Sequence, residues 1–521
     1  MKKTFLLVLA FLISSPIANS IDLDSLIIKS VGGPKAIERI KSLKSYKMTG
    51  KINWNGLDGN YTGIVKMPNL VKVTADFESF SIEQGFDGQN AWQKDMHGRV
   101  FDLAGFEKTE LMRNVYFMSF AYAVPGSFSG DAELLDSFES DITDVYSVNF
   151  FPFLNDTVAT VFEFLDSLHI RQFTRLDNLV VITELTEFKS IDSILFPLHT
   201  VSVAENTPML TEIFVDSISL DLDLQDSEFS KPEITPNDFH FPPNLSSVTI
   251  PFIYSNGHVL VNIQVNGYKK GLFILDTGAS ATFYDENFVK GLNLAPAGEL
   301  PSMGLGGFQK MQLVSLDSIN IGQLTLYNQT AGVLPLENLS VQIPGKSDFG
   351  GLLGYDFFMR FPVMIDFQKQ SLTVFNPSNF ELPKNGVEHP FQLSMMIPTV
   401  KGDLNGNPGL FIVDLGNSTG LIVHQKFGEK LGDLIAPDST GENDRKLGGV
   451  GQDVLGRDLK LESLQIGAHN INIPDAILAE SSFGLTGSWE IAGNIGTKVL
   501  EQYRILFDYP NSRLVFYDLV K

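Results

Sequence analysis

Hydrophobic and polar residues alternate along much of the chain, and this pattern predicts a protein built mainly from β-strands. In five short segments between residues 46 and 94, apolar residues recur on alternate positions, as expected for strands with one buried face. Helices are predicted over residues 23–43, with a break at Gly32-Gly33, and over residues 106–122. Strands dominate again from residue 145 to residue 217. Residues 21–230 are therefore predicted to form an α+β domain with one antiparallel sheet.

A segment rich in proline follows this first region. Residues 226–247 are rich in Pro, Asn, Ser and acidic residues, and the prolines at 232, 236, 242 and 243 disfavour regular structure. We therefore expect a linker over residues 231–248.

After residue 249 the sequence runs twice through the same pattern. Each copy contains an apolar run that ends on an acid, Asp276 in the first and Asp414 in the second. These acids follow Pro251 and Pro390 by 25 and 24 residues. A glycine cluster and a later apolar segment ending in glycine recur in the same order. Residues 249–376 and 377–521 are therefore predicted to form two similar β-rich lobes.

Composition narrows the classes of function. A chain of 521 residues is too long for one core and predicts two to four domains. A net charge of -23 argues against a nucleic-acid partner. The absence of cysteine excludes disulfides, a cysteine nucleophile and cysteine metal sites.

The first 20 residues have the pattern of a secretory signal peptide. A basic end precedes an apolar centre over residues 5–13, and small residues at 18 and 20 favour cleavage before Ile21. Together with the lack of cysteine, this pattern predicts an exported protein of the Gram-negative periplasm or the bacterial exterior.

The duplicated pattern resembles the bilobal aspartic peptidase family. Asp276-Thr277-Gly278-Ala279 is similar to the family signature in its retropepsin-like form, and Leu352-Leu353-Gly354 is similar to its usual companion. The resemblance covers residues 249–521 and implies a two-lobed β-barrel fold of the retropepsin/pepsin kind. It implies that Asp276 and Asp414 are the catalytic pair, with Thr277, Gly278 and Gly416 in support. Because one chain supplies both acids, a monomer is expected.

The chemistry of this family explains the residue types. One carboxylate takes a proton from a bound water, while the other, protonated, donates a proton to the carbonyl of the peptide bond. Two carboxyls in contact share one proton and titrate as a pair. The resemblance therefore implies an aspartic endopeptidase that acts on polypeptides and needs no cofactor or metal.

Two glycine clusters fall where that family carries a mobile flap. Gly304, Gly306 and Gly307 are the predicted flap residues of the first copy, and residues 448–451 correspond to them in the second. An ordinary hairpin turn is the alternative interpretation, especially for the second cluster.

The second copy departs from the family pattern around Asp414. Leu415 replaces a hydroxyl residue, and Asn417 and Asn494 stand where other residue types are usual. We expect these changes to weaken the support of Asp414. The alternative function is accordingly a catalytically inactive pseudopeptidase that binds peptides or lipids in the cell envelope. Ala279 replaces a serine found in other members, which predicts a raised pKa for the pair and an optimum nearer neutral pH.

The first region resembles the periplasmic lipoprotein-carrier (LolA-like) family. The resemblance rests on Gly32-Gly33 and on residues 82–92 and 188–197. It implies a curved antiparallel sheet around helices and a lipid or acyl-chain ligand for residues 21–230. The alternative is that these are turn and strand residues of any antiparallel sheet.

Other motifs are weaker. Residues 416–420 match the G-x-S-x-G nucleophile elbow, which makes Ser418 a candidate nucleophile, but the match lies within a duplicated turn. The eight histidines show no metal-ligand spacing. Asp366 and Asp508 are predicted to be structural turn acids.

Overall fold

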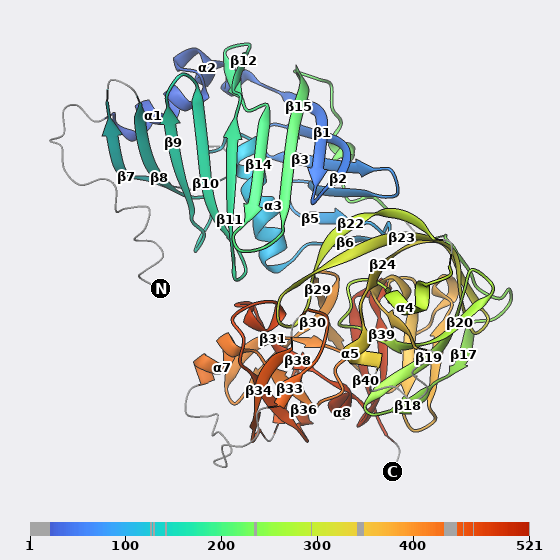
Figure 1. The fold of residues 1–521 in the computed structure, drawn as a ribbon. Coiled ribbons are helices and arrows are strands. Elements are labelled where there is room, and N and C mark those ends of the chain that lie inside the picture. Colours follow the sequence, from blue (N-terminus) through green and yellow to red (C-terminus); the bar gives the residue numbers. More distant parts are fainter. Residues whose placement is uncertain are drawn as a thin grey trace.

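The computed structural model describes residues 21–519, except for residues 125–127, 129–130, 141–142, 234–236, 293, 341–348, 432–444, 452 and 462. The predicted signal peptide and part of the predicted linker thus lie outside the described residues. The chain folds into one large antiparallel sheet followed by two β-rich lobes (Figure 1), so the prediction of a mainly β protein is confirmed.

The N-terminal sheet has 13 strands, with β1 and β15 adjacent at its centre and β6 and β7 at its edges. Its strands are β1 (Ser45–Trp54), β2 (Leu57–Lys66), β3 (Leu70–Phe77), β4 (Ser81–Phe86), β5 (Ala91–Lys94), β6 (Val100–Asp102), β7 (Asp131–Glu139), β8 (Asp144–Phe151), β9 (Val158–Phe164), β10 (Leu168–Leu176), β11 (Leu179–Thr186), β14 (His199–Ala204) and β15 (Leu210–Leu220). A separate hairpin consists of β12 (Lys189–Ile191) and β13 (Ile194–Phe196).

Three helices pack against this sheet, namely α1 (Leu23–Val31), α2 (Pro34–Ser42) and α3 (Gly105–Met118). The predicted break is confirmed, because Gly32 ends α1 with φ 114° and Pro34 opens α2. Helix α3 ends four residues earlier than predicted, and Phe120 just beyond it has φ 55°, which a helix does not allow. In the part of the chain that the structure describes, no helix is long and apolar enough to cross a membrane.

The first lobe is built on a nine-stranded sheet. Its strands are β16 (Phe239–His240), β18 (Ile253–Ser255), β19 (His258–Val265), β20 (Lys269–Leu275), β21 (Phe283–Asp285), β22 (Ala295–Met303), β23 (Phe308–Ile321), β24 (Leu324–Leu334) and β25 (Phe349–Leu353). Short helices α4 (Glu286–Val289), α5 (Glu337–Ser340) and α6 (Tyr355–Phe358) connect them.

The second lobe repeats this plan on a ten-stranded sheet. Its strands are β29 (Gln392–Ser394), β30 (Ile397–Leu404), β31 (Asn407–Val413), β32 (Leu421–Val423), β33 (Arg445–Leu447), β34 (Val454–Leu459), β35 (Ser463–Ile466), β36 (His469–Asn472), β37 (Ala476–Ala479) and β38 (Ile491–Ile495). Its helices are α7 (Gln425–Leu431) and α8 (Thr497–Leu500).

A six-stranded sheet joins the two lobes. It consists of β17 (Ser247–Pro251), β26 (Pro362–Asp366), β27 (Ser371–Phe375), β28 (Val387–Pro390), β39 (Tyr503–Asp508) and β40 (Arg513–Asp518). At its centre β26 of the first lobe runs antiparallel to β39, its counterpart in the second. The duplication seen in the sequence is therefore present in the fold.

The segment after the first sheet contains more structure than its prolines suggested. Strand β16 pairs with β24, and β17 pairs with β27, so both are edge strands that tolerate flanking prolines. Asp238 also forms an ion pair with the buried Arg360. The expectation of irregular structure is therefore wrong for these residues, while the predicted domain limits stay a prediction.

The N-terminal sheet is anchored to the junction of the lobes through the turn between β5 and β6. The guanidinium of Arg99, which is 7% exposed, donates to the carbonyls of Tyr509 and Met359. In the same turn, Asp95 accepts a hydrogen bond of 2.6 Å from the hydroxyl of Tyr355. Because these buried polar groups satisfy one another across the contact, the sheet and the lobes are held in a fixed relation.

Replacing Arg99 with methionine tests this anchor. The substitution keeps most of the side-chain volume but removes the donor to the buried carbonyl of Met359 and leaves that of Tyr509 with the amide of Ser512 alone, which costs about 1–3 kcal/mol. We expect a lower urea midpoint for unfolding. The control is Arg171→Met, which removes a more exposed arginine paired with Glu184 and should leave the midpoint nearly unchanged. Equal midpoints for the two variants would show that Arg99 does not anchor the contact.

Candidate functional site

Asp276 and Asp414 occupy equivalent places in the two lobes. Each follows a buried strand, β20 or β31, that runs parallel to a second strand of its lobe. The amide of Asp276 donates to the carbonyl of Leu353, and the amide of Asp414 donates to the carbonyl of Ile495, both at 2.9 Å. The two acids thus leave their sheets with the same backbone geometry.

Glycines let the two turns approach each other. A Cβ atom on Gly278 would lie 2.5 Å from Oδ1 of Asp414, and one on Gly416 would lie 2.4 Å from Cγ of Asp276. Each carboxyl therefore occupies the space that a side chain on the opposite turn would need. Each carboxyl is therefore near enough to the other to alter its pKa. The structure thus brings together two acids that lie 138 positions apart (276 and 414) in the sequence.

Asp414 has more hydrogen-bond donors than Asp276. Its carboxylate accepts from the amides of Gly416 at 2.9 Å and Asn417 at 3.1 Å, and from Nδ2 of Asn494 at 2.9 Å. Asp276 accepts from the backbone amides of Gly278, at 2.8 Å, and Ala279. Since donors favour the ionised form, Asp414 is the better anion of the pair.

Burial raises the pKa of Asp276 well above its usual value, and the nearby charge of Asp414 raises it further. Burial also raises the pKa of Asp414, but the donors from Asn494, Gly416 and Asn417 oppose this effect. Two like charges cannot both form readily in such a site. Ionisation of one carboxyl therefore opposes ionisation of the other, and the donors favour Asp414 as the one that ionises first.

Thr277 connects the two turns from one side. Its hydroxyl donates to the carbonyl of Val413 at 2.7 Å and accepts from the amide of Leu415 at 2.9 Å. Leu415 has no hydroxyl to return these bonds, and its side chain is fully buried in the core. Half of a symmetric arrangement is thus present, with an apolar contact in place of the other half.

The expectation that Asn417 and Asn494 weaken the support of Asp414 is wrong. Asn494 donates to Asp414 directly, and Asn417 contributes its amide to Asp414 and its Nδ2 to the carbonyl of Asn494. Because a carboxylate only accepts, Nδ2 of Asn494 must face Asp414. Its Oδ1 then faces Nε2 of His424 at 2.7 Å.

This arrangement identifies His424 as a residue that the sequence did not single out. Burial lowers the pKa of His424 to about 4, so the ring is neutral near pH 7. Since Oδ1 of Asn494 can only accept, the ring proton sits on Nε2. His424, Asn494 and Asp414 thus form a continuous hydrogen-bonded chain. The sequence signal for this chain of hydrogen bonds is Asn494, the single polar residue in the buried strand β38.

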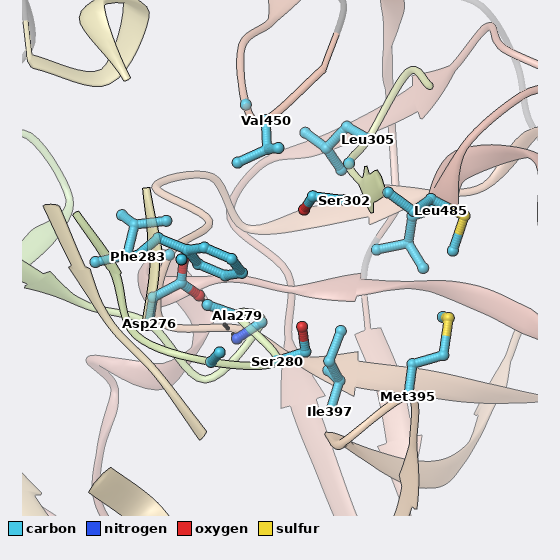
Figure 2. Close-up of a pocket in the computed structure, with 18 of the residues that line it drawn as sticks. Asp276, Ala279, Ser280, Phe283, Ser302, Leu305, Met395, Ile397, Val450 and Leu485 are labelled. Atoms are coloured by element: carbon cyan, nitrogen blue, oxygen red, sulfur yellow. Dashed lines mark hydrogen bonds between the residues drawn. The ribbon is translucent and has the colours of Figure 1, made fainter. Parts of the chain in front are cut away.

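The two carboxyls face a cavity of about 480 Å³. In Figure 2, Asp276, Ala279 and Ser280 lie on one side of it, and Leu305 and Val450 lie on the other. Most of the lining side chains are apolar, as is usual for a site that binds an organic ligand.

Hairpin tips from both lobes meet on the side opposite the carboxyls. The turn with Gly304, Gly306 and Gly307 joins β22 to β23, and residues 448–451 lie between β33 and β34. A Cβ atom on Gly304 would overlap the carbonyl oxygen of Val450, at 1.7 Å. The amide of Gly451 donates to Oε1 of Gln309 at 3.1 Å. Both glycine clusters are thus hairpin turns, and they contact each other on one side of the cavity.

Sequence reasoning missed one wall of this cavity. Side chains from the N-terminal sheet line it together with the two lobes, and these are Trp54, Asn55, Met96, His97 and Met209. They come from the turns β1–β2, β5–β6 and β14–β15. No local pattern marks these turns, because their place depends on how the sheet packs against the lobes.

The remaining candidates lie in other surroundings. The chain after Ser418 enters strand β32, so the strand–turn–helix context of a nucleophile elbow is not formed. Asp508 accepts from Asn511 and Arg513 in a turn, as expected of a structural acid, and Asp366 does the same with Lys369. Among the described residues, no three His, Asp or Glu side chains gather as a metal site would require.

Comparison with known protein families finds a match, which lies in the first lobe. The family model of aspartyl proteases matches residues 261–357. The resemblance inferred from the sequence is confirmed for this segment, and the chain contains an aspartyl protease-like domain. A search of curated proteins finds no match.

Several solved structures are similar in fold to parts of the chain. An aspartic proteinase from Irpex lacteus is 14% identical, and the match covers 52% of this chain and 97% of that one with a TM-score of 0.34. A DUF1329 family protein from Desulfovibrio piger is 13% identical, with coverage of 37% and 92% and a TM-score of 0.27. A domain described as an outer membrane lipoprotein-sorting protein from Vibrio parahaemolyticus is 13% identical, with coverage of 37% and 93% and a TM-score of 0.26.

The pH dependence of stability tests the shared proton. Because folding raises the pKa of both acids, their contribution to stability is fully present below the usual aspartate pKa and is lost as the pH rises through the folded pKa. Asp276→Asn keeps this position neutral at every pH, so folding no longer has to hold a proton there as the pH rises. We expect its unfolding temperature to exceed that of the unmodified protein at pH 8, and the difference to shrink toward pH 4.

The control for this measurement is Asp317→Asn, which changes an exposed acid of β23 and should show no such trend. A difference for Asp276→Asn that is constant with pH would contradict the raised pKa of the pair.

Proposed function

We propose that the protein is an aspartic endopeptidase that hydrolyses peptide bonds with a water activated by Asp276 and Asp414. One observation carries this proposal. Two carboxyls from duplicated turns lie close together, because a glycine in each turn leaves room for the opposite carboxyl. Both line a cavity that is large enough for part of a peptide. The aspartyl protease family match over residues 261–357 supports it.

The hydrogen bonds around the pair support a different role for each acid. Asp414, with three donors, is the carboxylate that takes a proton from the attacking water. Asp276 carries the shared proton and donates it to the carbonyl oxygen of the peptide bond. The reaction then proceeds through a tetrahedral hydrate, without a covalent bond between enzyme and substrate. When the hydrate collapses, Asp414 gives its proton to the leaving nitrogen and Asp276 takes one from a hydroxyl of the hydrate, which restores the starting state of the pair.

The surrounding residues support this chemistry. Gly278 and Gly416 let the carboxyls meet, and Thr277 holds the two turns in register. We further propose that the hairpin tip with Gly304, Gly306 and Gly307 acts as a flap that opens for substrate and excludes water when closed.

The inactive alternative is not favoured, because the second-copy residues that suggested it donate hydrogen bonds to Asp414 or to its neighbour.

Three expectations stay predictions. These are export to the periplasm or exterior, action as a monomer, and a lipid or acyl-chain ligand for residues 21–230. Aromatic side chains, among them Tyr116, Phe117 and Phe150, occupy part of the interior between α3 and the N-terminal sheet.

Removing either acid tests the proposed pair. Asp276→Asn and Asp414→Asn should each lower peptide cleavage by about a thousandfold or more, since neither acid alone performs both proton transfers. A statine-type inhibitor should block the unmodified protein. The control, Asp366→Asn, changes the structural turn acid and should retain activity. Full activity in either active-site variant would overturn the paired-acid mechanism.

The acid limb of the pH–rate profile tests the assignment of Asp414 as the base. The raised pKa of the pair predicts an optimum well above pH 4. Asn494→Leu copies Leu352, its counterpart in the first lobe, and removes a donor to Asp414. We expect the limb to move upward by roughly one pH unit. Asn470→Leu, at an exposed position in β36, serves as the control. An unmoved limb in Asn494→Leu would contradict the role given to Asp414.

A further inference from the structure

Both lobes have a hairpin turn at an equivalent position, and the two turns differ in sequence. In the first lobe, Asn256-Gly257 joins β18 to β19 with φ values of 52° and 79°. In the second lobe, Met395-Met396 joins β29 to β30 with φ values of 50° and 64°. Both turns begin five residues after Pro251 or Pro390. The backbone conformation is therefore the same, while the residues are not.

Methionine is a poor choice for this conformation. A two-residue turn with positive φ at both positions strongly prefers Asn-Gly, because glycine has no Cβ to crowd the backbone and the side chain of asparagine can bond to it. The first lobe follows this preference. Since strained residues of this kind concentrate at functional sites, the two methionines point to a need for their side chains at this position.

Both side chains line the cavity that contains Asp276 and Asp414. Figure 2 shows Met395 beyond Ser280 and Ile397, away from Asp276. Six of the 13 methionines of the chain line this one cavity, namely Met96, Met209, Met303, Met311, Met395 and Met396. Such a concentration forms a flexible, polarizable surface that adapts to apolar groups of different shape.

Two of these methionines come from the N-terminal sheet. Met96 lies in the β5–β6 turn and Met209 just before β15. The β5–β6 turn is held by the hydrogen bond between Asp95 and Tyr355. The amide of Met395 donates to Oε2 of Glu107 in α3 at 3.0 Å. Contacts between the sheet and the lobes thus fix both sides of this surface, as a specificity site requires.

We propose that Met395 and Met396, together with Met96 and Met209, form a subsite that selects substrates with a large apolar side chain (leucine, methionine or phenylalanine) away from the peptide bond that is cut. The N-terminal sheet is then part of the substrate-binding site. This inference rests on the proposed peptidase function and gives it a substrate class.

The test exchanges the second-lobe turn for the first-lobe turn. The double variant Met395→Asn with Met396→Gly should fold and be at least as stable as the unmodified protein, because it relieves the positive-φ strain. On a peptide library, we expect the preference for a large apolar residue to disappear at one substrate position. There kcat/KM should fall about tenfold for the best peptides and stay unchanged for peptides with alanine.

A second variant and a control complete this test. Met96→Ala with Met209→Ala should weaken the preference at the same substrate position. Met112→Leu, in α3 and outside the cavity lining, should leave the preference unchanged. An unaltered preference in both double variants would overturn the proposed subsite.

A binding measurement separates failure of the subsite from failure of the peptidase. If the unmodified protein cleaves no peptide in the library, the proposed function is wrong. The subsite is then read from the affinity of the Asp276→Asn chain for fluorescent peptides that carry leucine or alanine at each position. Tighter binding of a leucine peptide, lost when Met395-Met396 becomes Asn-Gly, supports the subsite. Equal affinities overturn it.

Discussion

The structure depends on holding two carboxyls in contact where little water can screen them. An isolated buried charge is costly, and two like charges in contact are costlier still, so the pair is stable only with one proton between them. Gly278 and Gly416 make the approach possible because neither turn has a side chain to occupy the space. Strands β20 and β31 fix the direction from which each acid enters. Much of the two-lobed fold can be understood as a means of presenting these two turns to each other.

The duplicated turns are not equivalent, and the difference gives each acid its own state. Asp414 has an additional donor from Asn494, which is oriented in turn by neutral His424. Asp276 has only backbone donors besides its partner. A symmetric pair shares a proton without preference, whereas the unequal donors here favour ionisation of Asp414. Leu415 shows the same division, because it contributes packing where Thr277 contributes hydrogen bonds.

The local pattern of residues in the sequence was enough to predict many of the strands and helices. Alternation predicted the strands of the N-terminal sheet, and the break at Gly32-Gly33 followed from backbone conformation. The repeat predicted that Asp276 and Asp414 occupy equivalent turns, since copied sequences fold alike. The bond from Asn494 to Asp414 could not be predicted in the same way, because it joins residues 80 positions apart and has no counterpart in the first copy. The wall formed by Met96 and Met209 depends on the packing of separate sheets, which periodicity does not report.

The number of protons held by the carboxyl pair tests the central claim most directly. It is measured by potentiometric titration at pH 6 of the unmodified protein against the double variant Asp276→Asn with Asp414→Asn, with the difference normalised per molecule. The shared-proton arrangement predicts one additional proton on the unmodified chain. A difference of zero, with both carboxyls ionised, or of two, with both protonated, would contradict the account of this site.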